Sequence, residues 1–121
     1  MYRNLTPHPI HIFASDQDDE PIRTIQPGLK AARLAEKRRT ISPDFDGDGF
    51  PLTMVELGEI QNLPAPQPGV MLIVSFHVAE KAQRVDVVSP GKLKRDSEGN
   101  TVGSVGLTAY VEPGEGPLDD G

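Results

Sequence analysis

The sequence predicts a mainly β domain of the α+β class, built as a small antiparallel sheet or a partly open barrel with one short helix after its central strand. Twelve glycines and twelve prolines make 24 of the 121 residues, about 20% against a usual share of about 12%, so long helices are not expected. The apolar residues gather in short β-branched runs bounded by turn residues, and one short segment has helical spacing instead. We expect a single domain over residues 1–111 and a flexible acidic tail, rich in glycine and proline, over residues 112–121.

The first third of the chain predicts a hairpin followed by another strand. Residues 10–13 (Ile-His-Ile-Phe) form a β-branched run directly after Pro9, and residues 22–26 form a second one. The acidic turn at residues 15–21 joins these two runs into a hairpin. Residues 29–41 favour a helix by their alanine, lysine and arginine content, whereas the preceding Pro-Gly and the neighbouring strands favour an extended chain. We predict a strand.

The middle of the chain predicts a loop, a strand, a stiff connector and the central strand, in this order. Residues 42–51 have the composition of a loop, and residues 52–57 form an extended run that stops before Gly58. Residues 62–69 carry three prolines, which remove three backbone donors and hold the segment extended at the surface. Residues 70–74 (Val-Met-Leu-Ile-Val) are the most apolar stretch, which is typical of a strand buried on both faces at the centre of the core.

The last third predicts the helix and a second hairpin. Ser75 stands at an N-cap position, and residues 76–83 continue at helical spacing without glycine or proline. Residues 86–88 predict a short strand that ends in a Ser-Pro-Gly turn at residues 89–91. The β-forming residues over 101–111 are interrupted by glycines, and this pattern predicts a terminal hairpin with bulges.

Charge and composition exclude several classes of function. The formal net charge of −6 repels a phosphate backbone, so no nucleic-acid partner is expected. The chain has no cysteine, which excludes a disulfide framework, a thiolate metal site and a cysteine nucleophile. No window of the sequence has the length and hydrophobicity of a membrane span or a secretory leader. We therefore expect a cytoplasmic protein without a membrane partner.

An acidic loop supplies the sharpest chemical motif. Residues 44–49 (Asp-Phe-Asp-Gly-Asp-Gly) place Asp44, Asp46 and Asp48 at positions 1, 3 and 5 of a Ca²⁺-binding loop, with glycine at position 6. Position 12 is Val55, where a bidentate glutamate is expected, and the flanking prolines exclude the helices of an EF-hand. A solvated turn is the simpler interpretation. Ca²⁺ remains a hypothesis, and no other cofactor is expected.

Three residues are of the types used in acyl transfer. Ser75, His8 and Asp86 supply a nucleophile, a base and an orienting carboxylate, but nothing in their spacing requires them to meet. The sequence contains no nucleophile elbow and no phosphate-binding glycine loop. His8 and His11 are three residues apart and point to opposite faces of a strand, so no zinc site is expected.

The end of the central strand favours an anionic ligand. Unpaired backbone N–H groups and the positive end of the dipole gather where the predicted helix begins, at Ser75. Basic residues of the helix and the following segments supply charge contacts, although Lys92, Lys94 and Arg95 are explained more simply as edge-strand charges that discourage aggregation. The candidate ligand-binding residues are Thr6, His8, Ser75, Arg84, Asp86, Ser89, Arg95 and Asn100.

Several short motifs follow one another along residues 4–108. They are Asn-Leu-Thr-Pro-His at 4–8, Leu-Gly-Glu-Ile at 57–60, Leu-Pro-Ala-Pro at 63–66, Ile-Val-Ser at 73–75, Asp-Val-Val-Ser-Pro-Gly at 86–91, Arg-Asp at 95–96 and Gly-Asn at 99–100. In this combination the chain resembles a family of small proteins of bacteria, especially actinobacteria, and of their phages, which has no assigned reaction or ligand. The resemblance implies a cytoplasmic or phage-associated accessory protein, and the acidic loop is not part of its pattern.

Three hypotheses of function follow. The preferred one is a non-enzymatic accessory protein that binds a small anionic, nucleotide-like ligand. The alternative is a protein-binding or virion-associated module that uses the proline-rich connector at 63–68 and the acidic tail as contacts. An enzyme of unknown reaction is the weakest hypothesis. A homo-oligomer is compatible with each of them. The fold or an oligomer is needed to bring the basic residues Lys37, Arg38 and Arg39 together with Lys92, Lys94 and Arg95 as phosphate contacts.

Overall fold

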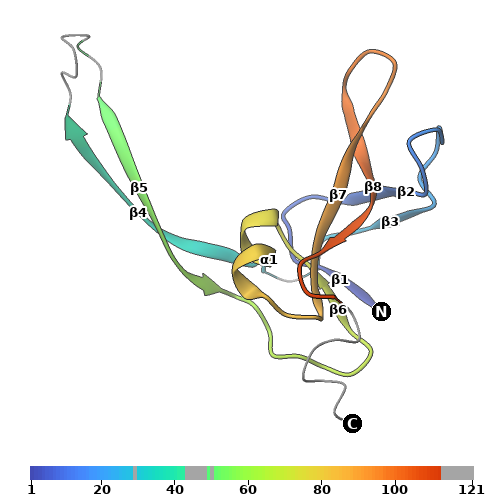
Figure 1. Cartoon of the computed structure of the whole chain (residues 1–121), viewed down its shortest axis with the longest axis horizontal. Helices are drawn as coiled ribbons and strands as arrows, with labels where there is room; N and C mark the ends of the chain where they lie inside the picture. Colours follow the sequence, from blue (N-terminus) through green and yellow to red (C-terminus); the bar gives the residue numbers. More distant parts are fainter. Residues whose placement is uncertain (29, 43–48, 50, 113–121) are drawn as a thin grey trace.

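A six-stranded sheet curled toward a barrel, a long two-stranded arm and one helix make up the fold (Figure 1). The computed structural model describes residues 1–28, 30–42, 49 and 51–112. The larger sheet has the order β1-β6-β7-β8-β2-β3, and the arm pairs β4 with β5. The bounds are β1 Tyr2–Asn4, β2 Ile10–Phe13, β3 Arg23–Ile25, β4 Arg33–Ser42, β5 Leu52–Gln61, β6 Met71–Ile73, α1 Phe76–Ala82, β7 Val87–Arg95 and β8 Thr101–Ala109. The mainly β class, the partly open barrel and the helix after the central strand are confirmed.

The larger sheet mixes parallel and antiparallel pairs. β1 pairs with β6, β6 with β7, and β2 with β8, all in parallel. The two hairpins, β2–β3 and β7–β8, are antiparallel. A bridge between Asn4 and Pro27 brings the end of β3 back to β1. This bridge joins the two ends of the sheet and nearly closes the barrel.

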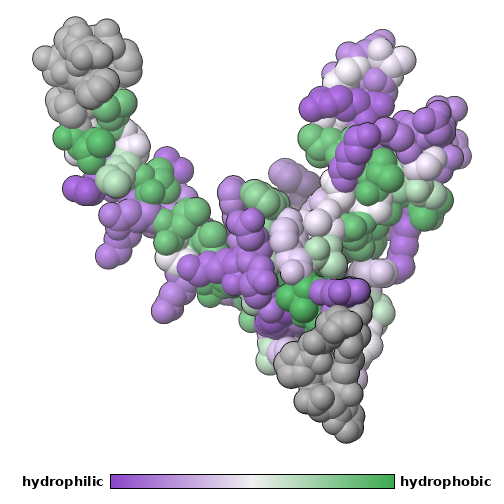
Figure 2. All heavy atoms as spheres, in the orientation of Figure 1, coloured by the Kyte–Doolittle hydropathy of each residue, from purple (hydrophilic) through white to green (hydrophobic). Residues whose placement is uncertain are grey.

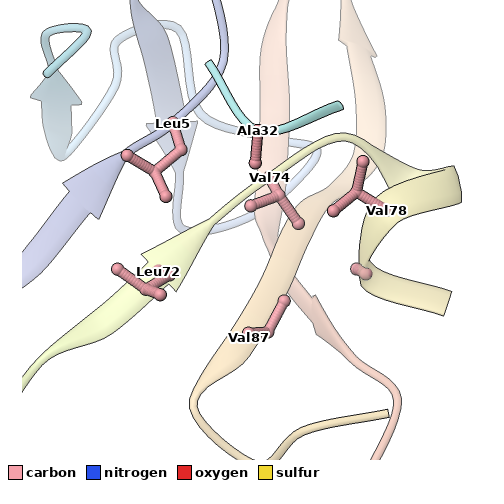
Figure 3. Packing of buried hydrophobic residues seen from close by; sticks show 7 residues of the cluster. Leu5, Ala32, Leu72, Val74, Val78 and Val87 are labelled. Atoms are coloured by element: carbon pink, nitrogen blue, oxygen red, sulfur yellow. The ribbon is translucent and has the colours of Figure 1, made fainter. Parts of the chain in front are cut away.

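The central strand β6 is buried on both faces, as predicted. Leu72 and Val74 point toward one cluster of apolar side chains and Ile73 toward another, because neighbouring side chains alternate along a strand. Each such side chain contributes about 1.5–3 kcal/mol to stability by leaving water. The outer cluster lies between the sheet, the helix and the root of the arm, and it comprises Leu5, Ala32, Leu72, Val74, Val78, Ala79 and Val87 (Figure 3). The second cluster comprises Ile10, Ile12, Ile25, Ile73 and Val88.

The helix α1 matches the predicted segment to within one residue. Ser75 occupies the N-cap position in an extended conformation, but its side chain makes no capping hydrogen bond. Gln83 ends the helix with a left-handed backbone (φ 49°), and its N–H donates to the carbonyl of Ala79. Val78 and Ala79 are the buried residues of the helix, so this short element is held by packing on the outer cluster.

Residues 33–41 of the ambiguous segment at 29–41 form a strand, β4, which continues to Ser42, so the strand prediction is confirmed for this part of the segment. β4 pairs along ten residues with β5, and the register shifts twice, between Leu34 and Glu36 and between Thr40 and Ser42. β5 continues through Gly58, where the sequence predicted its end, because Leu57 and Ile60 on either side of it pair with β4. The arm projects away from the barrel (Figure 1). The loop was predicted at 42–51, but Ser42 belongs to β4. Residues 43–48 and 50 of this loop, with the three aspartates of the acidic motif, lie outside the described residues, as do residues 113–121 of the tail predicted at 112–121.

One prediction about the last third is wrong. The Ser-Pro-Gly segment at 89–91 is not a turn, because β7 runs through it without a break to Arg95. Only the first two residues of β7 pair with β6, so one edge of the strand lacks a strand partner at Pro90 in the described part of the chain. Proline is tolerated at such an edge. The predicted terminal hairpin is present: residues 101–109 of the run at 101–111 form β8, which pairs with β7, and the register shifts between Lys94 and Arg95.

The β7–β8 turn carries a carboxylate with a lowered pKa. Asp96 Oδ1 accepts hydrogen bonds from the backbone N–H groups of Asn100 and Glu98, both at 2.9 Å. These bonds favour the charged form and hold the pKa of Asp96 below its usual value of 3.8. The turn is therefore stabilised above the pKa of the unfolded chain, and this stabilisation is lost as the pH falls through the lower pKa of the folded chain.

We expect a carboxyl titration of Asp96 by NMR to give a midpoint below 3.8. Asp96→Ala removes the acceptor and should accelerate hydrogen exchange at the amides of Glu98 and Asn100, while the amides of the β2–β3 hairpin serve as an internal control. A midpoint at or above the usual value would show that the carboxylate does not hold this turn.

Candidate functional site

The N-terminal motif at 4–8 is held together by the buried side chain of Asn4. Its Nδ2 donates to the carbonyls of His8 (2.7 Å) and Ile25 (2.9 Å), and its Oδ1 accepts from the backbone N–H (2.9 Å) and the hydroxyl (2.7 Å) of Thr6. Thr6 Oγ1 also lies 3.0 Å from the His8 carbonyl. Two predicted ligand residues, Thr6 and His8, therefore belong to a loop that Asn4 fastens to β3. The exposed ring of His8 makes no contact in this network.

Arg84 and Asp86 form a bidentate ion pair. Arg84 Nε lies 2.9 Å from Asp86 Oδ1, and Nη2 lies 2.6 Å from Oδ2. Asp86 is buried, and its carbonyl accepts the N–H of Leu72, so the pair fixes the chain between the helix and β7. Ser89, also buried, has its hydroxyl 3.1 Å from that of Tyr110. Arg84, Asp86 and Ser89, which the sequence predicted as ligand-binding residues, thus form hydrogen bonds within the chain.

The remaining predicted residues lie apart from this pair. Ser75 is exposed and lines a groove of about 600 Å³ between the helix and the arm. Arg95 lines a groove of about 510 Å³ near the tip of the β7–β8 hairpin, and its Nη1 donates to the carbonyl of Gly99. Asn100 is exposed in the same turn. The structure thus distributes the eight predicted residues over the N-terminal loop, the helix start, the 84–89 segment and the hairpin tip.

The side of the β7–β8 hairpin is joined to the acidic turn at 15–21. Lys92 Nζ lies 2.8 Å from Asp16 Oδ2, and Lys94 Nζ donates to the Asp16 carbonyl at 2.7 Å. The hydrogen bond to Lys92 lowers the pKa of Asp16, and the same contact raises the pKa of Lys92. Because all three side chains are exposed or nearly so, this contact orients the two hairpins and adds little stability.

The described residues assemble neither a metal site nor a catalytic triad. No group of three potential metal ligands is found among them, and Asp44, Asp46 and Asp48 of the hypothetical Ca²⁺ loop lie outside them. No hydrogen bond joins His8, Ser75 and Asp86, and both oxygens of Asp86 accept from Arg84. The one helix of the described chain is too short to cross a membrane.

A cavity of about 940 Å³, larger than the two grooves described above, lies beside β1. Three segments meet there, namely β1 with the following residue, the segment after β3, and the start of the connector after β5. The N–H of Gly28 donates to the Asn4 carbonyl at 2.8 Å, and Asn62 Nδ2 donates to the Ala31 carbonyl at 3.2 Å, so hydrogen bonds link the walls. The lining residues are Tyr2, Arg3, Asn4, Leu5, Gln26, Gly28, Lys30, Asn62, Leu63 and Pro64.

This cavity combines an apolar floor with a basic rim. Leu5 and Leu63 belong to the outer cluster of the core. Arg3 and Lys30 are exposed cations, and no carboxylate is among the described lining residues, although the whole chain carries eighteen. Because side chains alternate along β1, the burial of Asn4 on one face leaves Arg3 on the other. The local charge is therefore opposite to that of the chain as a whole.

A sharp backbone turn at Asn62 directs the following residues toward the cavity. The φ of Asn62, 66°, lies in the left-handed region, which asparagine tolerates better than most residues. This turn ends β5 and starts the proline-rich connector, so Leu63 and Pro64 reach the cavity. The predicted surface connector thus forms, with its first residues, part of the wall of this cavity.

The site has to be interpreted from its own residues. No protein-family model, no curated protein and no solved structure matches the chain.

Sequence reasoning missed Arg3, Lys30 and Asn62 as site residues. β1 is only three residues long and was not predicted, so nothing indicated that Arg3 lies on a strand. Lys30 and Asn62 are more than thirty residues apart in sequence, and the hydrogen bond between Asn62 and Ala31 brings their segments together. For Asn62 the sequence did contain a signal, namely the Gln-Asn-Leu-Pro sequence that follows a β-forming run. Asparagine in such a position is typical of a sharp turn.

Proposed function

We propose that this protein binds a small anionic, nucleotide-like ligand in the cavity beside β1 and has no catalytic role. The observation that carries the proposal is the pairing of Arg3 and Lys30 over an apolar floor without a carboxylate. Ligand cavities are usually apolar and hold a few polar groups that fix the orientation of the ligand. The setting, an accessory protein of a bacterium or a phage, is supported by the resemblance of the sequence motifs.

The size and chemistry of the cavity fit this class of ligand. Its volume of about 940 Å³ lies in the range of roughly 300–1,000 Å³ that small-molecule sites occupy. Leu5, Leu63 and Pro64 offer an apolar surface for a planar ring, and the two cations offer charge-assisted hydrogen bonds to phosphate oxygens. Gln26 and Asn62 add amide groups with which the edge of a base is recognised.

Thermal unfolding in the presence of nucleotides and cyclic nucleotides tests the proposal. A ligand present at 100 times its dissociation constant stabilises the folded chain by about 2.7 kcal/mol, which gives a clear rise in Tm. We expect at least one nucleotide to raise Tm and inorganic phosphate alone to have a smaller effect, because phosphate does not use the apolar floor. No rise with any nucleotide would overturn the proposal.

The double variant Arg3→Ala with Lys30→Ala locates the site. Each charge-assisted hydrogen bond contributes about 1.5–3 kcal/mol, so the dissociation constant of the stabilising nucleotide should rise on the order of a hundredfold. The matched control is Lys81→Ala with Arg95→Ala, which removes the same charge from exposed positions outside the cavity. If both double variants weakened nucleotide binding equally, binding would depend on the net charge of the chain and not on this cavity.

A further inference from the structure

The arm formed by β4 and β5 is a ribbon with two open edges. In the described part of the chain no third strand pairs with either β4 or β5, and only the root of the arm lies near the helix. Each strand is ten residues long, so both edges present a long row of backbone N–H and C=O groups. A two-stranded hairpin is only marginally stable in water on its own. The arm therefore gains stability from an added strand.

Both faces of the arm expose large apolar side chains. Val55 and Leu57 are 41% and 52% exposed on one face, and Met54 is 41% exposed on the other. Ile41, near the end of β4, is 51% exposed. Figure 2 shows that hydrophobic and hydrophilic residues are interleaved along the arm. Such an alternating surface favours binding by edge-to-edge pairing with another strand over binding through a flat hydrophobic face.

The two strands carry opposite charge. β4 has four cations and one carboxylate, a net charge of +3, whereas β5 has two carboxylates and no cation, a net charge of −2. Among the described side chains of the arm, the ion pair formed is that between Arg38 and Glu36, which both lie on β4. The register of the arm places Lys37 opposite Glu56, but the two side chains do not form an ion pair, so both strands have charges available for a neighbouring chain.

We infer that the arm pairs with the arm of a second copy of this chain, with the β4 edge of one copy against the β5 edge of the next. This contact places basic residues beside acidic ones, whereas β4 against β4 or β5 against β5 would place like charges together. An antiparallel contact continues the order of the hairpin, so neighbouring arms point the same way. The interface is heterologous, and it builds a ring or an open chain of copies rather than a closed pair. It does not depend on the ligand cavity, which lies beside β1.

Charge reversal tests the pairing. Lys37→Glu with Arg39→Glu makes the β4 edge acidic, and Glu56→Lys with Glu59→Lys makes the β5 edge basic. In sedimentation experiments the wild type should form oligomers, and each variant alone should associate on the order of a hundredfold more weakly. An equimolar mixture of the two variants should associate as strongly as the wild type, because each acidic edge then meets a basic one. The variant with all four reversals keeps complementary edges and should associate like the wild type, which controls for an effect on folding. A wild type that is monomeric at millimolar concentration would overturn the inference.

Cross-linking distinguishes the heterologous contact from a two-fold one. Because the chain has no cysteine, Thr40→Cys on β4 and Thr53→Cys on β5 each introduce a single reactive thiol at an exposed position. With a bifunctional thiol reagent, we expect dimers in the mixture of the two variants and few in either variant alone. Efficient cross-linking of Thr40→Cys or Thr53→Cys by itself would show that like edges meet, and would contradict the proposed arrangement.

Discussion

Replacing Asn4 with alanine is expected to lower the free energy of unfolding by about 3 kcal/mol or more. The side chain is 1% exposed and makes four hydrogen bonds, two as donor and two as acceptor. Its removal leaves buried groups such as the Ile25 carbonyl without a partner, and each unsatisfied buried group costs about 1–3 kcal/mol. Urea denaturation measures the loss, provided that the slope of the transition remains that of the wild type.

The control for this prediction is Asn100→Ala, which removes the same side chain from an exposed turn and should cost less than about 0.5 kcal/mol. Asn4→Asp is a sharper version, because it turns the Nδ2 donor into an oxygen that faces the carbonyls of His8 and Ile25. We expect it to destabilise the chain at least as much as alanine. A loss below about 1 kcal/mol for both Asn4 variants would mean that this network does not hold the N-terminal loop.

Replacing Gly91 with alanine is expected to cost about 3 kcal/mol. A Cβ at this position would overlap the Val105 carbonyl oxygen and come within 2.9 Å of the Gly106 carbonyl oxygen. Both obstacles are backbone atoms of the paired strand β8, so neither can move as a flexible side chain would. Overpacking of this kind costs about 1–3 kcal/mol, and the rigid ladder puts this site at the upper end.

Gly58→Ala is the matched control for this prediction. In β5 the added Cβ would lie 3.6 Å from the Cβ and the carbonyl oxygen of Ala35, which is an ordinary contact. Alanine there should leave stability unchanged or raise it by about 0.4–1 kcal/mol, because glycine has more conformational freedom to lose on folding. Equal destabilisation by the two variants would show that the close contact between the backbones of β7 and β8 is not what requires glycine at position 91.

The sequence predicted those elements whose formation depends on local pattern. The apolar run around Ile73, the helix after Ser75 and the hairpin of β2 with β3 each carry a periodicity and a boundary that identify them. The three-residue strand β1 has no such pattern, and its pairing with β6 depends on residues about seventy positions away. The continuation of β7 through Pro90 was also not predictable, because a Ser-Pro-Gly sequence by itself indicates a turn. The strand continues here because it pairs with β8.

The candidate site was less predictable than the fold. The sequence singled out polar residues with chemical potential, and the structure shows that Arg84, Asp86 and Ser89 contact other residues of the chain. The buried anchor Asn4 was not among the predicted site residues, although it fixes Thr6 and His8, which were. Arg3 and Lys30 lie in unremarkable contexts in the sequence, and only the convergence of three segments gives them a common cavity. No local motif encodes such a convergence.

An NMR titration of the isotope-labelled chain tests the proposed ligand cavity most directly. The nucleotide that raises Tm is added stepwise, and the backbone amide shifts are followed. We predict that the largest changes fall on the cavity residues Arg3, Gln26, Lys30 and Asn62, and that they disappear in the Arg3→Ala, Lys30→Ala double variant. Changes centred on Ser75 and Ser89, or on the hairpin tip around Arg95, would contradict the assignment of the cavity beside β1.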